Sequence, residues 1–283
     1  MPAIVTDRWT CPTCRRTVET PYCPTCGERP RSPRELTLIG LCEQAFEAFT
    51  NVDGRLLRSF RYLIAAPGAL TVAFVEGKRK PYLGPVALFL VANVVFFGAE
   101  SMTRGFVFST PLTSHLNTQP WSALAQPIVA GRLASQSVAL ESYAPRFDAA
   151  IALHARSMIL AMVVAFAPVL ALVFRRRRQP FATHVVFSLH LYAFMLLLLS
   201  IGTAVPAAPI LAGGTRSTSD LLDAVLTIAL MIACAAYLYP AVRAVYGVSR
   251  SRRVLSTVAL TAAVAAIVLG YRFALFVFTL YTT

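Results

Sequence analysis

The chain has 283 residues, of which 57% are apolar and only 14% are charged, and its mean hydropathy is +0.63. This composition excludes an ordinary soluble domain of that length and indicates several membrane spans. The formal net charge of +13 comes from 26 Lys and Arg residues against 13 Asp and Glu residues. In a membrane protein, such an excess is typical of cytoplasmic loops rather than of a nucleic-acid-binding surface.

Two Cys-x-x-Cys pairs open the chain: Cys11 with Cys14, and Cys23 with Cys26. Four thiolates are the usual ligands of a tetrahedral structural zinc ion, and a gap of two residues lets one turn offer two sulfurs. The reducing cytoplasm, in which the charge bias places this segment, disfavours a disulfide. A thioredoxin-like redox pair would need a βαβ setting, and four cysteine ligands leave no coordination position open for catalysis. We therefore predict a cytoplasmic zinc ribbon over residues 1–31 that binds one structural zinc ion.

The residue that follows each Cys pair differs between the two turns. Gly27 follows the second pair, where a positive φ lets backbone N–H groups point at the sulfurs. Arg15 stands at the equivalent place after the first pair, where a non-Gly residue would cost about 1–2 kcal/mol in the left-handed conformation. We therefore expect the first turn to be less regular than the second.

Residues 32–80 predict amphipathic helices at the membrane surface. The sequence SPRE is typical of a capping box and starts the first helix. A second helix is predicted over 54–64, with Arg55, Arg58 and Arg61 on the face opposite its apolar side chains. A basic amphipathic helix beside a membrane span indicates an interface with anionic lipids. The alternative is a small soluble bundle in which these arginines pair with acidic residues of the first helix.

A third, short helix is predicted over 67–76, because Pro67 can begin it and Gly77 would end it. The positions after it fall at the level of the lipid headgroups, where each cation adds about 1 kcal/mol of attraction to an anionic leaflet. The residues predicted to contact headgroups there are Lys78, Arg79, Lys80 and Tyr82.

Five apolar stretches approach the roughly 20 residues that cross the hydrocarbon core of a bilayer, and we expect them to form a transmembrane bundle over 81–283. The cations concentrate before the first stretch, between the second and third, and between the fourth and fifth. This bias predicts a cytoplasmic N-terminus, an external C-terminus and a long external loop over 101–156. The predicted spans are about residues 83–99, 157–174, 184–206, 221–242 and 254–278.

Two histidines stand out in the predicted third span, because polar side chains are costly within a membrane. His184 lies near its cytoplasmic end, and His190 lies about 9 Å deeper by helical rise. Six residues correspond to about 600° of rotation, so the two rings do not share a helical face and make a poor metal pair. A hydrogen bond inside the bundle is the ordinary interpretation of His190, and a proton or ion site is the alternative.

The order of motifs in the first third of the chain supports a resemblance. The two Cys pairs and an Arg- and Leu-rich stretch are followed by PG at 67–68, GKR at 77–79, Tyr82 and Pro85. Over about residues 11–100, this order resembles an uncharacterised bacterial family with an N-terminal zinc ribbon and several transmembrane helices, catalogued as a domain of unknown function. The resemblance implies an inner-membrane protein and implies no activity.

The chain departs from the pattern of that family at two positions. Arg15 stands where members often have Gly, and Glu28 stands where members often have Gln. Both departures leave the four cysteines in place, so the implied zinc site is unaffected.

The motif content favours a protein without enzymatic activity, since no glycine-rich phosphate loop, HExxH or GxSxG pattern is present. We expect an all-α membrane protein of about five transmembrane helices, preceded by the small four-cysteine zinc ribbon and the interface helices. The ribbon is expected to dock a cytoplasmic protein partner and no nucleic acid, because residues 1–82 carry twelve Lys and Arg against eight Asp and Glu. The alternatives are a transporter or channel that uses polar residues of the third span, and a membrane enzyme or accessory protein acting on lipid or envelope substrates.

Overall fold

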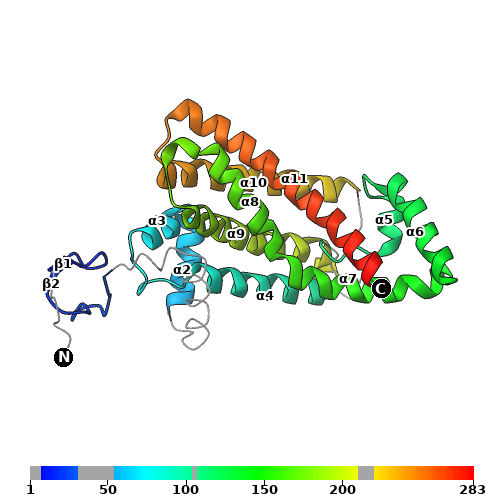
Figure 1. The fold of residues 1–283 in the computed structure, drawn as a ribbon, viewed down its shortest axis with the longest axis horizontal. Helices are drawn as coiled ribbons and strands as arrows, with labels where there is room; N and C mark the ends of the chain where they lie inside the picture. The colour runs from blue at the N-terminus through cyan, green and yellow to red at the C-terminus, as the bar shows by residue number, and fades with distance from the viewer. Residues whose placement is uncertain (1–7, 31–53, 104–106, 210–219) are drawn as a thin grey trace.

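The computed structural model of the protein describes residues 8–30, 54–103, 107–209 and 220–283. A small two-stranded unit lies at one end of the molecule, and a bundle of long helices runs away from it (Figure 1). The capping box predicted at 32–35 lies outside the described residues.

The N-terminal unit contains two very short strands, β1 (Trp9–Thr10) and β2 (Thr17–Val18). They pair antiparallel, with Trp9 opposite Val18 and Thr10 opposite Thr17. The buried apolar side chains among the described residues of this unit are Cys11, Val18 and Cys23, and only Trp9, Cys14 and Cys26 pack against them. A core of that size cannot offset the conformational entropy lost on folding, so the unit needs an additional constraint.

Helices α2 (Arg55–Ala65) and α3 (Ala69–Val75) follow, as the amphipathic pattern predicts. Glycines with positive φ stand on both sides of α3: Gly68, at φ +86°, precedes it, and Gly77, at φ +88°, follows it. The helix ends in two hydrogen bonds of the Schellman type, from Lys78 N–H to the Ala73 carbonyl at 2.8 Å and from Gly77 N–H to the Phe74 carbonyl at 3.0 Å.

Helix α3 packs into the bundle instead of lying on its surface. Its buried residues include Leu70, Thr71 and Phe74, and it contacts two of the long helices, α9 (Phe181–Ala207) and α10 (Asp220–Tyr246). Gly68 makes this approach possible, because a Cβ atom there would lie 2.9 Å from the Ala241 Cα of α10. The residues PG and GKR therefore stand on either side of a helix that is held against the bundle.

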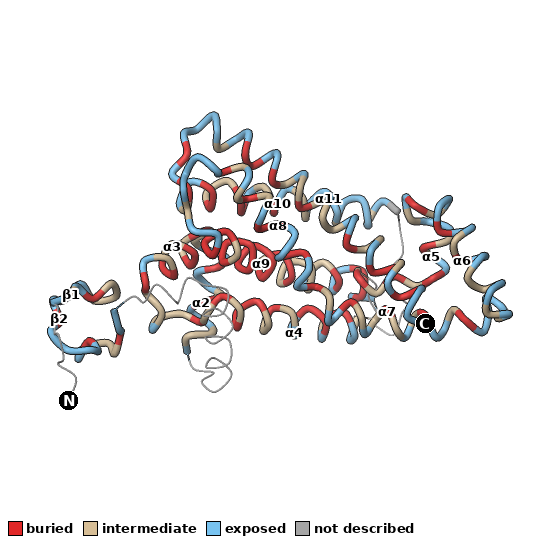
Figure 2. The backbone as a smooth tube through the Cα atoms, in the orientation of Figure 1, coloured by how far each residue is buried: buried red, intermediate tan, exposed pale blue. Residues whose placement is uncertain are grey.

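The bundle is built around α9, which is the most buried of the long apolar helices and contacts α4, α8 and α10 (Figure 2). Apolar side chains occur on all sides of α9, and the buried ones contact neighbours on several sides. This is the pattern expected of a helix surrounded by other apolar helices. The surrounding helices are α4 (Pro85–Thr103), α8 (Leu160–Val173), α10 and α11 (Arg250–Thr282).

Within the described residues, four helices are long and apolar enough to cross a membrane, namely α4, α9, α10 and α11. The count rises to five if α7 (Leu140–Met158) and α8 form one span, although they are bent by 44° where they meet. The span predicted at 157–174 thus coincides with α8 and the end of α7. The other four predicted spans fall within α4, α9, α10 and α11, apart from two residues at the start of the first.

The segment predicted as a long external loop at 101–156 is largely helical. It contains α5 (Leu112–Asn117), α6 (Ser122–Gln136) and most of α7, which gather at the end of the bundle opposite β1 and β2 (Figure 1). The C-terminus lies at this same end.

Candidate metal centre

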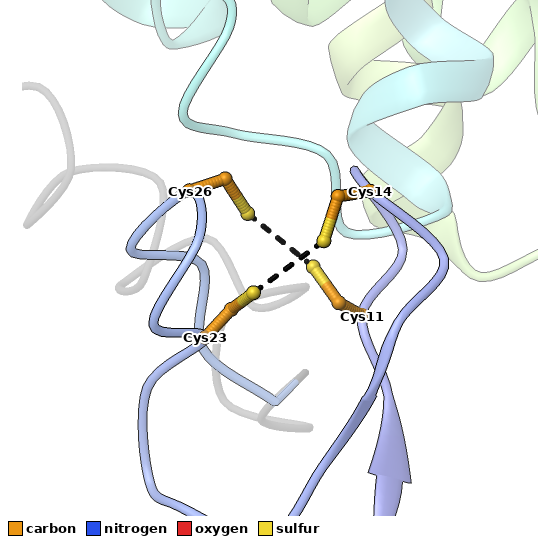
Figure 3. Close-up of side chains that lie close together, drawn as sticks. All are labelled: Cys11, Cys14, Cys23 and Cys26. Atoms are coloured by element: carbon orange, nitrogen blue, oxygen red, sulfur yellow. Dashed lines mark hydrogen bonds between the residues drawn. The ribbon is translucent and has the colours of Figure 1, made fainter.

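The four cysteines converge on one point of the N-terminal unit (Figure 3). All their Sγ atoms lie within 4.8 Å of one another, and the shortest separations are 3.4 Å, from Cys11 to Cys26 and from Cys14 to Cys23. Sulfurs bound to one tetrahedral zinc ion at 2.3 Å would lie about 3.8 Å apart. The cysteines are free thiols, so the described geometry fits a metal ion held by four sulfurs.

The two turns that carry the cysteines have matching backbone hydrogen bonds, contrary to the expectation of a less regular first turn. In the first, Cys11 N–H donates to the Arg16 carbonyl and Arg15 N–H donates to the Cys11 carbonyl, both at 2.9 Å. In the second turn, the equivalent bonds are 2.7 and 2.8 Å long. Arg15 adopts φ +59° and Gly27 adopts φ +70°, so the arginine takes the left-handed conformation that glycine takes in the second turn.

The cysteine thiols influence one another's ionisation. Burial opposes the ionisation of Cys23, but the N–H groups of Cys26 and Thr25 point at its sulfur and lower its pKa to about 6. At Cys26, the N–H of Glu28 favours the thiolate, yet burial and the neighbouring thiols raise the pKa to about 12. The Cys23 thiol therefore ionises readily, whereas a positive charge such as a metal ion would favour ionisation of the Cys26 thiol.

Glu28 attaches the metal-binding unit to the helical part of the chain. Its side chain is only 2% exposed, and its Oε2 atom accepts a hydrogen bond of 2.8 Å from the Thr13 hydroxyl within the unit. The same oxygen accepts bonds from the backbone N–H groups of Arg79 at 3.1 Å and Lys80 at 3.2 Å, in the turn between α3 and α4. One carboxylate oxygen thus links the turn of the first Cys pair to the edge of the bundle.

The residues predicted to contact lipid headgroups gather around this attachment. Lys78 forms an ion pair of 2.6 Å with Glu76, and the Arg79 guanidinium lies 5.3 Å from the centre of the Phe74 ring. Arg58 donates to the Pro81 carbonyl at 3.4 Å. Several of these cations are therefore engaged within the chain, and their binding to headgroups stays a prediction. The exposed cations of α2 are Arg58 and Arg61, whereas Arg55 is half-buried, and Tyr82 packs edge-on against Tyr62.

The two histidines of α9 both have partners inside the bundle. The Nδ1 atom of His190 lies 2.8 Å from the Thr71 Oγ1 of α3, and both side chains are buried. The Nδ1 atom of His184 lies 2.9 Å from the Tyr246 hydroxyl, at the end of α10. The structure does not bring the two rings to a common site, and the bond from His190 holds α3 against the bundle.

Buried and half-buried polar residues at the opposite end of the bundle have hydrogen bonds that were not predicted from the sequence. Glu100, near the end of α4, accepts a bond of 2.8 Å from the N–H of Val107. Arg272 of α11 donates to the Thr110 hydroxyl at 3.0 Å. A carboxylate near the end of an apolar stretch was the only signal in the sequence, and it does not identify the backbone N–H groups of Val107 and Phe108 as its partners.

His115 of α5 also lies at this end and is enclosed by aromatic rings. It stacks on Phe276 at 4.6 Å between ring centroids, and its Nδ1 atom accepts a bond of 3.2 Å from the Trp121 indole N–H. Burial, reinforced by the nearby Arg272 guanidinium, lowers the pKa of His115 to about 4. The ring is therefore neutral near pH 7 and acts here as a packing element with one hydrogen-bond acceptor.

The fold and the site define a mostly helical chain with four or five apolar helices able to span a membrane and an N-terminal cluster of four cysteines that can hold a metal ion. Residues 53–97 match a family described as "Protein of unknown function (DUF3667)". This match covers α2, α3 and most of α4, together with the PG and GKR motifs on either side of α3. No curated protein and no solved structure matches the chain.

Proposed function

We propose that the protein is a non-enzymatic, multi-pass protein of the bacterial inner membrane whose structural zinc ribbon is a docking platform for a cytoplasmic protein partner. The observation that carries this proposal is the buried Glu28 carboxylate, which holds the ribbon against the turn between α3 and α4. A ribbon fixed in this way presents its remaining surface in a constant orientation relative to the bundle.

Zinc is the metal that this site favours. Four thiolates suit a soft or borderline ion in tetrahedral geometry, and they leave no position for a substrate or an activated water. The ion would supply the positive charge that the crowded thiols need, and it would hold together a unit with almost no apolar core. The bound metal is therefore structural, and it makes the docking surface conditional on metal.

The ribbon carries a surface on which a partner could bind. A shallow groove of about 560 Å³ runs beside β2 and the second Cys pair. Its lining contains none of the residues that attach the ribbon to the bundle, so it stays accessible when the ribbon is attached. The residues that line it are Arg8, Arg16, Thr17, Val18, Glu19, Thr20, Pro24 and Thr25.

The distribution of cations supports one orientation of the chain across the membrane. The runs Lys78–Lys80 and Arg175–Arg178 and the arginines around the start of α11 lie at the ends of the helices that face the ribbon. The preference of such runs for the cytoplasmic side supports a cytoplasmic ribbon and an external C-terminus. Reporters fused after residues 82, 120 and 283 should then show inside, outside and outside.

Metal analysis and partner analysis test the proposal together. The purified protein should contain about one zinc ion per chain, and Cys11→Ser with Cys14→Ser should remove it, whereas Cys234→Ser in α10 should not. Proximity labelling in cells should lose specific partners in the zinc-site double variant and retain them in the Cys234 variant. Full zinc retention by the double variant would refute the metal site, and an unchanged partner set would refute the docking role.

A further inference from the structure

Two basic turns lie side by side at the ribbon end of the bundle. The first turn follows α8 and holds Arg175–Arg178, partly within the short 3-10 helix η2 (Arg175–Arg177). The second turn joins α10 to α11, and Arg250, Arg252 and Arg253 follow it in the first turn of α11. No Asp or Glu occurs over 174–184 or 243–254, so neither turn carries a carboxylate of its own.

The two turns are fixed relative to each other by contacts between residues far apart in sequence. The Arg177 guanidinium donates to the Gly247 carbonyl at 3.1 Å. Beneath it, the rings of Phe174 and Tyr246 stack with centroids 3.8 Å apart, and the Tyr246 hydroxyl bonds to His184. The surface that the turns form is therefore preorganised, unlike a flexible basic tail.

Five of the seven arginines in these turns have no partner among the described residues. Arg177 is held as above, and Arg253 bonds the Tyr239 hydroxyl at 2.6 Å while lying 3.8 Å above that ring. The other five side chains are exposed and make no hydrogen bond or ion pair within the described part of the chain. These are Arg175, Arg176, Arg178, Arg250 and Arg252.

Two of the unpartnered arginines, Arg250 and Arg252, lie at the N-terminus of α11, where the helix dipole already has their own sign. The first turn of α11 contains no acidic residue, and the hydroxyl of its N-cap residue, Ser249, makes no capping bond. Helix N-termini carry a partial positive charge, so cations there repel the helix as well as one another. A bound anion would relieve both repulsions, and planar guanidinium groups suit the oxygens of a phosphate.

Apolar side chains beside the arginines indicate that the anion carries a hydrocarbon part. Leu172, three residues before the first basic turn, is 68% exposed, and Leu255, in the second turn of α11, is 71% exposed. Phe181, at the start of α9, is 49% exposed. These residues lie on apolar helices able to cross a membrane, α8 as part of its bent pair with α7, and the arginines stand at the ends of those helices. An amphiphile with a phosphate head would satisfy both parts, and a soluble anion only one.

We propose that the two basic turns form a binding site for the phosphate of an anionic phospholipid headgroup. Arg175, Arg176 and Arg178 bind the phosphate from one side, and Arg250 and Arg252 bind it from the other. Arg177 and Arg253 position the two turns. This site is separate from the ribbon, and the proposal does not depend on the ribbon having a partner.

Replacing arginine by lysine separates this proposal from a general preference of cations for the cytoplasmic side. Lysine keeps the charge and hence the topology, but it lacks the planar fork that binds two phosphate oxygens. We expect Arg175→Lys, Arg176→Lys and Arg178→Lys together to weaken binding of phosphatidic acid by about tenfold. The matched control is Arg132→Lys of α6 with Arg146→Lys and Arg156→Lys of α7, which should change binding little because these helices gather at the opposite end of the bundle.

Native mass spectrometry of the full-length protein in detergent measures this binding, with phosphatidylcholine as the neutral lipid and thermal unfolding as the check on folding. Equal binding by the wild type and the site variant, or equal losses in the site and control variants, would overturn the proposal in favour of diffuse attraction. Competition with inorganic phosphate distinguishes a lipid site from a site for soluble anions. If inorganic phosphate displaces phosphatidic acid at a similar concentration, the lipid assignment is also overturned. Selective loss of phosphatidic acid in the site variant alone would support it.

Discussion

Glu28→Ala tests whether one buried carboxylate holds the ribbon against the bundle. The substitution removes the acceptor of three hydrogen bonds, from the Thr13 hydroxyl at 2.8 Å and from the N–H groups of Arg79 at 3.1 Å and Lys80 at 3.2 Å. A hydrogen bond to a charged group contributes about 1.5–3 kcal/mol. Only the two bonds from Arg79 and Lys80 cross to the bundle, and they share one oxygen whose burial itself has a cost, so we expect a net loss of about 3 kcal/mol in attachment. That loss is more than a hundredfold in the equilibrium between attached and detached ribbon.

Amide hydrogen exchange at Arg79 and Lys80 reports this equilibrium directly, in the full-length protein with metal bound. The two N–H groups should exchange about a hundredfold faster in Glu28→Ala than in the wild type. Glu28→Gln retains an oxygen acceptor but loses the charge, so its effect should be smaller, about 1 kcal/mol. Glu19→Ala is the matched control, because Glu19 pairs with Arg8 at the exposed surface of the same ribbon.

The result that contradicts the argument is also specific. If both amides stay as protected in Glu28→Ala as in the wild type, the carboxylate does not hold the ribbon in place. Zinc content must be measured alongside, since loss of metal would unfold the ribbon and release the same amides by another route. Equal exchange in Glu19→Ala and Glu28→Ala would likewise show that the effect comes from net charge and not from the contact.

For three other substitutions, the structure predicts the direction of the change in stability or in its pH dependence. Gly68→Ala should destabilise the fold by about 2–5 kcal/mol, because its Cβ would lie 2.9 Å from Ala241 and because φ is +86°; Gly202→Ala, with nothing within 4 Å, is the control in thermal unfolding. Arg15→Gly should stabilise the metal-bound ribbon by about 1 kcal/mol at φ +59°, seen in guanidinium unfolding. His115, with its pKa lowered from 6.5 to about 4, takes up its proton earlier in the unfolded state. Stability should therefore fall by at most about 1.4 kcal/mol for each pH unit between pH 6.5 and about 4, and less steeply in His115→Gln. The same slope in both proteins would contradict this.

The positions of the long helices could be predicted because hydropathy and charge act locally. The third predicted span, 184–206, falls inside α9 (Phe181–Ala207), and the fifth, 254–278, falls inside α11 (Arg250–Thr282). The helices extend past the apolar stretches because backbone hydrogen bonds continue where apolar side chains stop. The second predicted span begins within α7, since composition contains no signal for the 44° bend between α7 and α8.

The contacts that position the sites could not be predicted, because they join residues distant in sequence. The bond between Thr71 and His190 and the bond from Arg177 to the Gly247 carbonyl each depend on how whole helices pack. The four cysteines were predictable because their spacing is local. Arg15 was misjudged for another reason: the strain of a positive φ at one residue is small beside the constraint that the hairpin and the sulfur cluster impose on the turn.

The attachment of the ribbon depends on backbone shape, and this gives a final prediction. Glu28 binds N–H groups of residues 79–80, so the contact does not require particular side chains there, but it does require the direction of those N–H groups. That direction is set just upstream, where Gly77 at φ +88° closes the Schellman motif that ends α3. Gly77→Ala adds about 1–2 kcal/mol of strain to this conformation. It should therefore loosen the ribbon, speeding exchange at residues 79–80 although neither Glu28 nor its partners are changed. Fast exchange with full zinc content would show that the turn after α3 controls the attachment of the ribbon. Exchange at the wild-type rate would contradict this and show that Glu28 holds the two N–H groups even when the Schellman motif is strained.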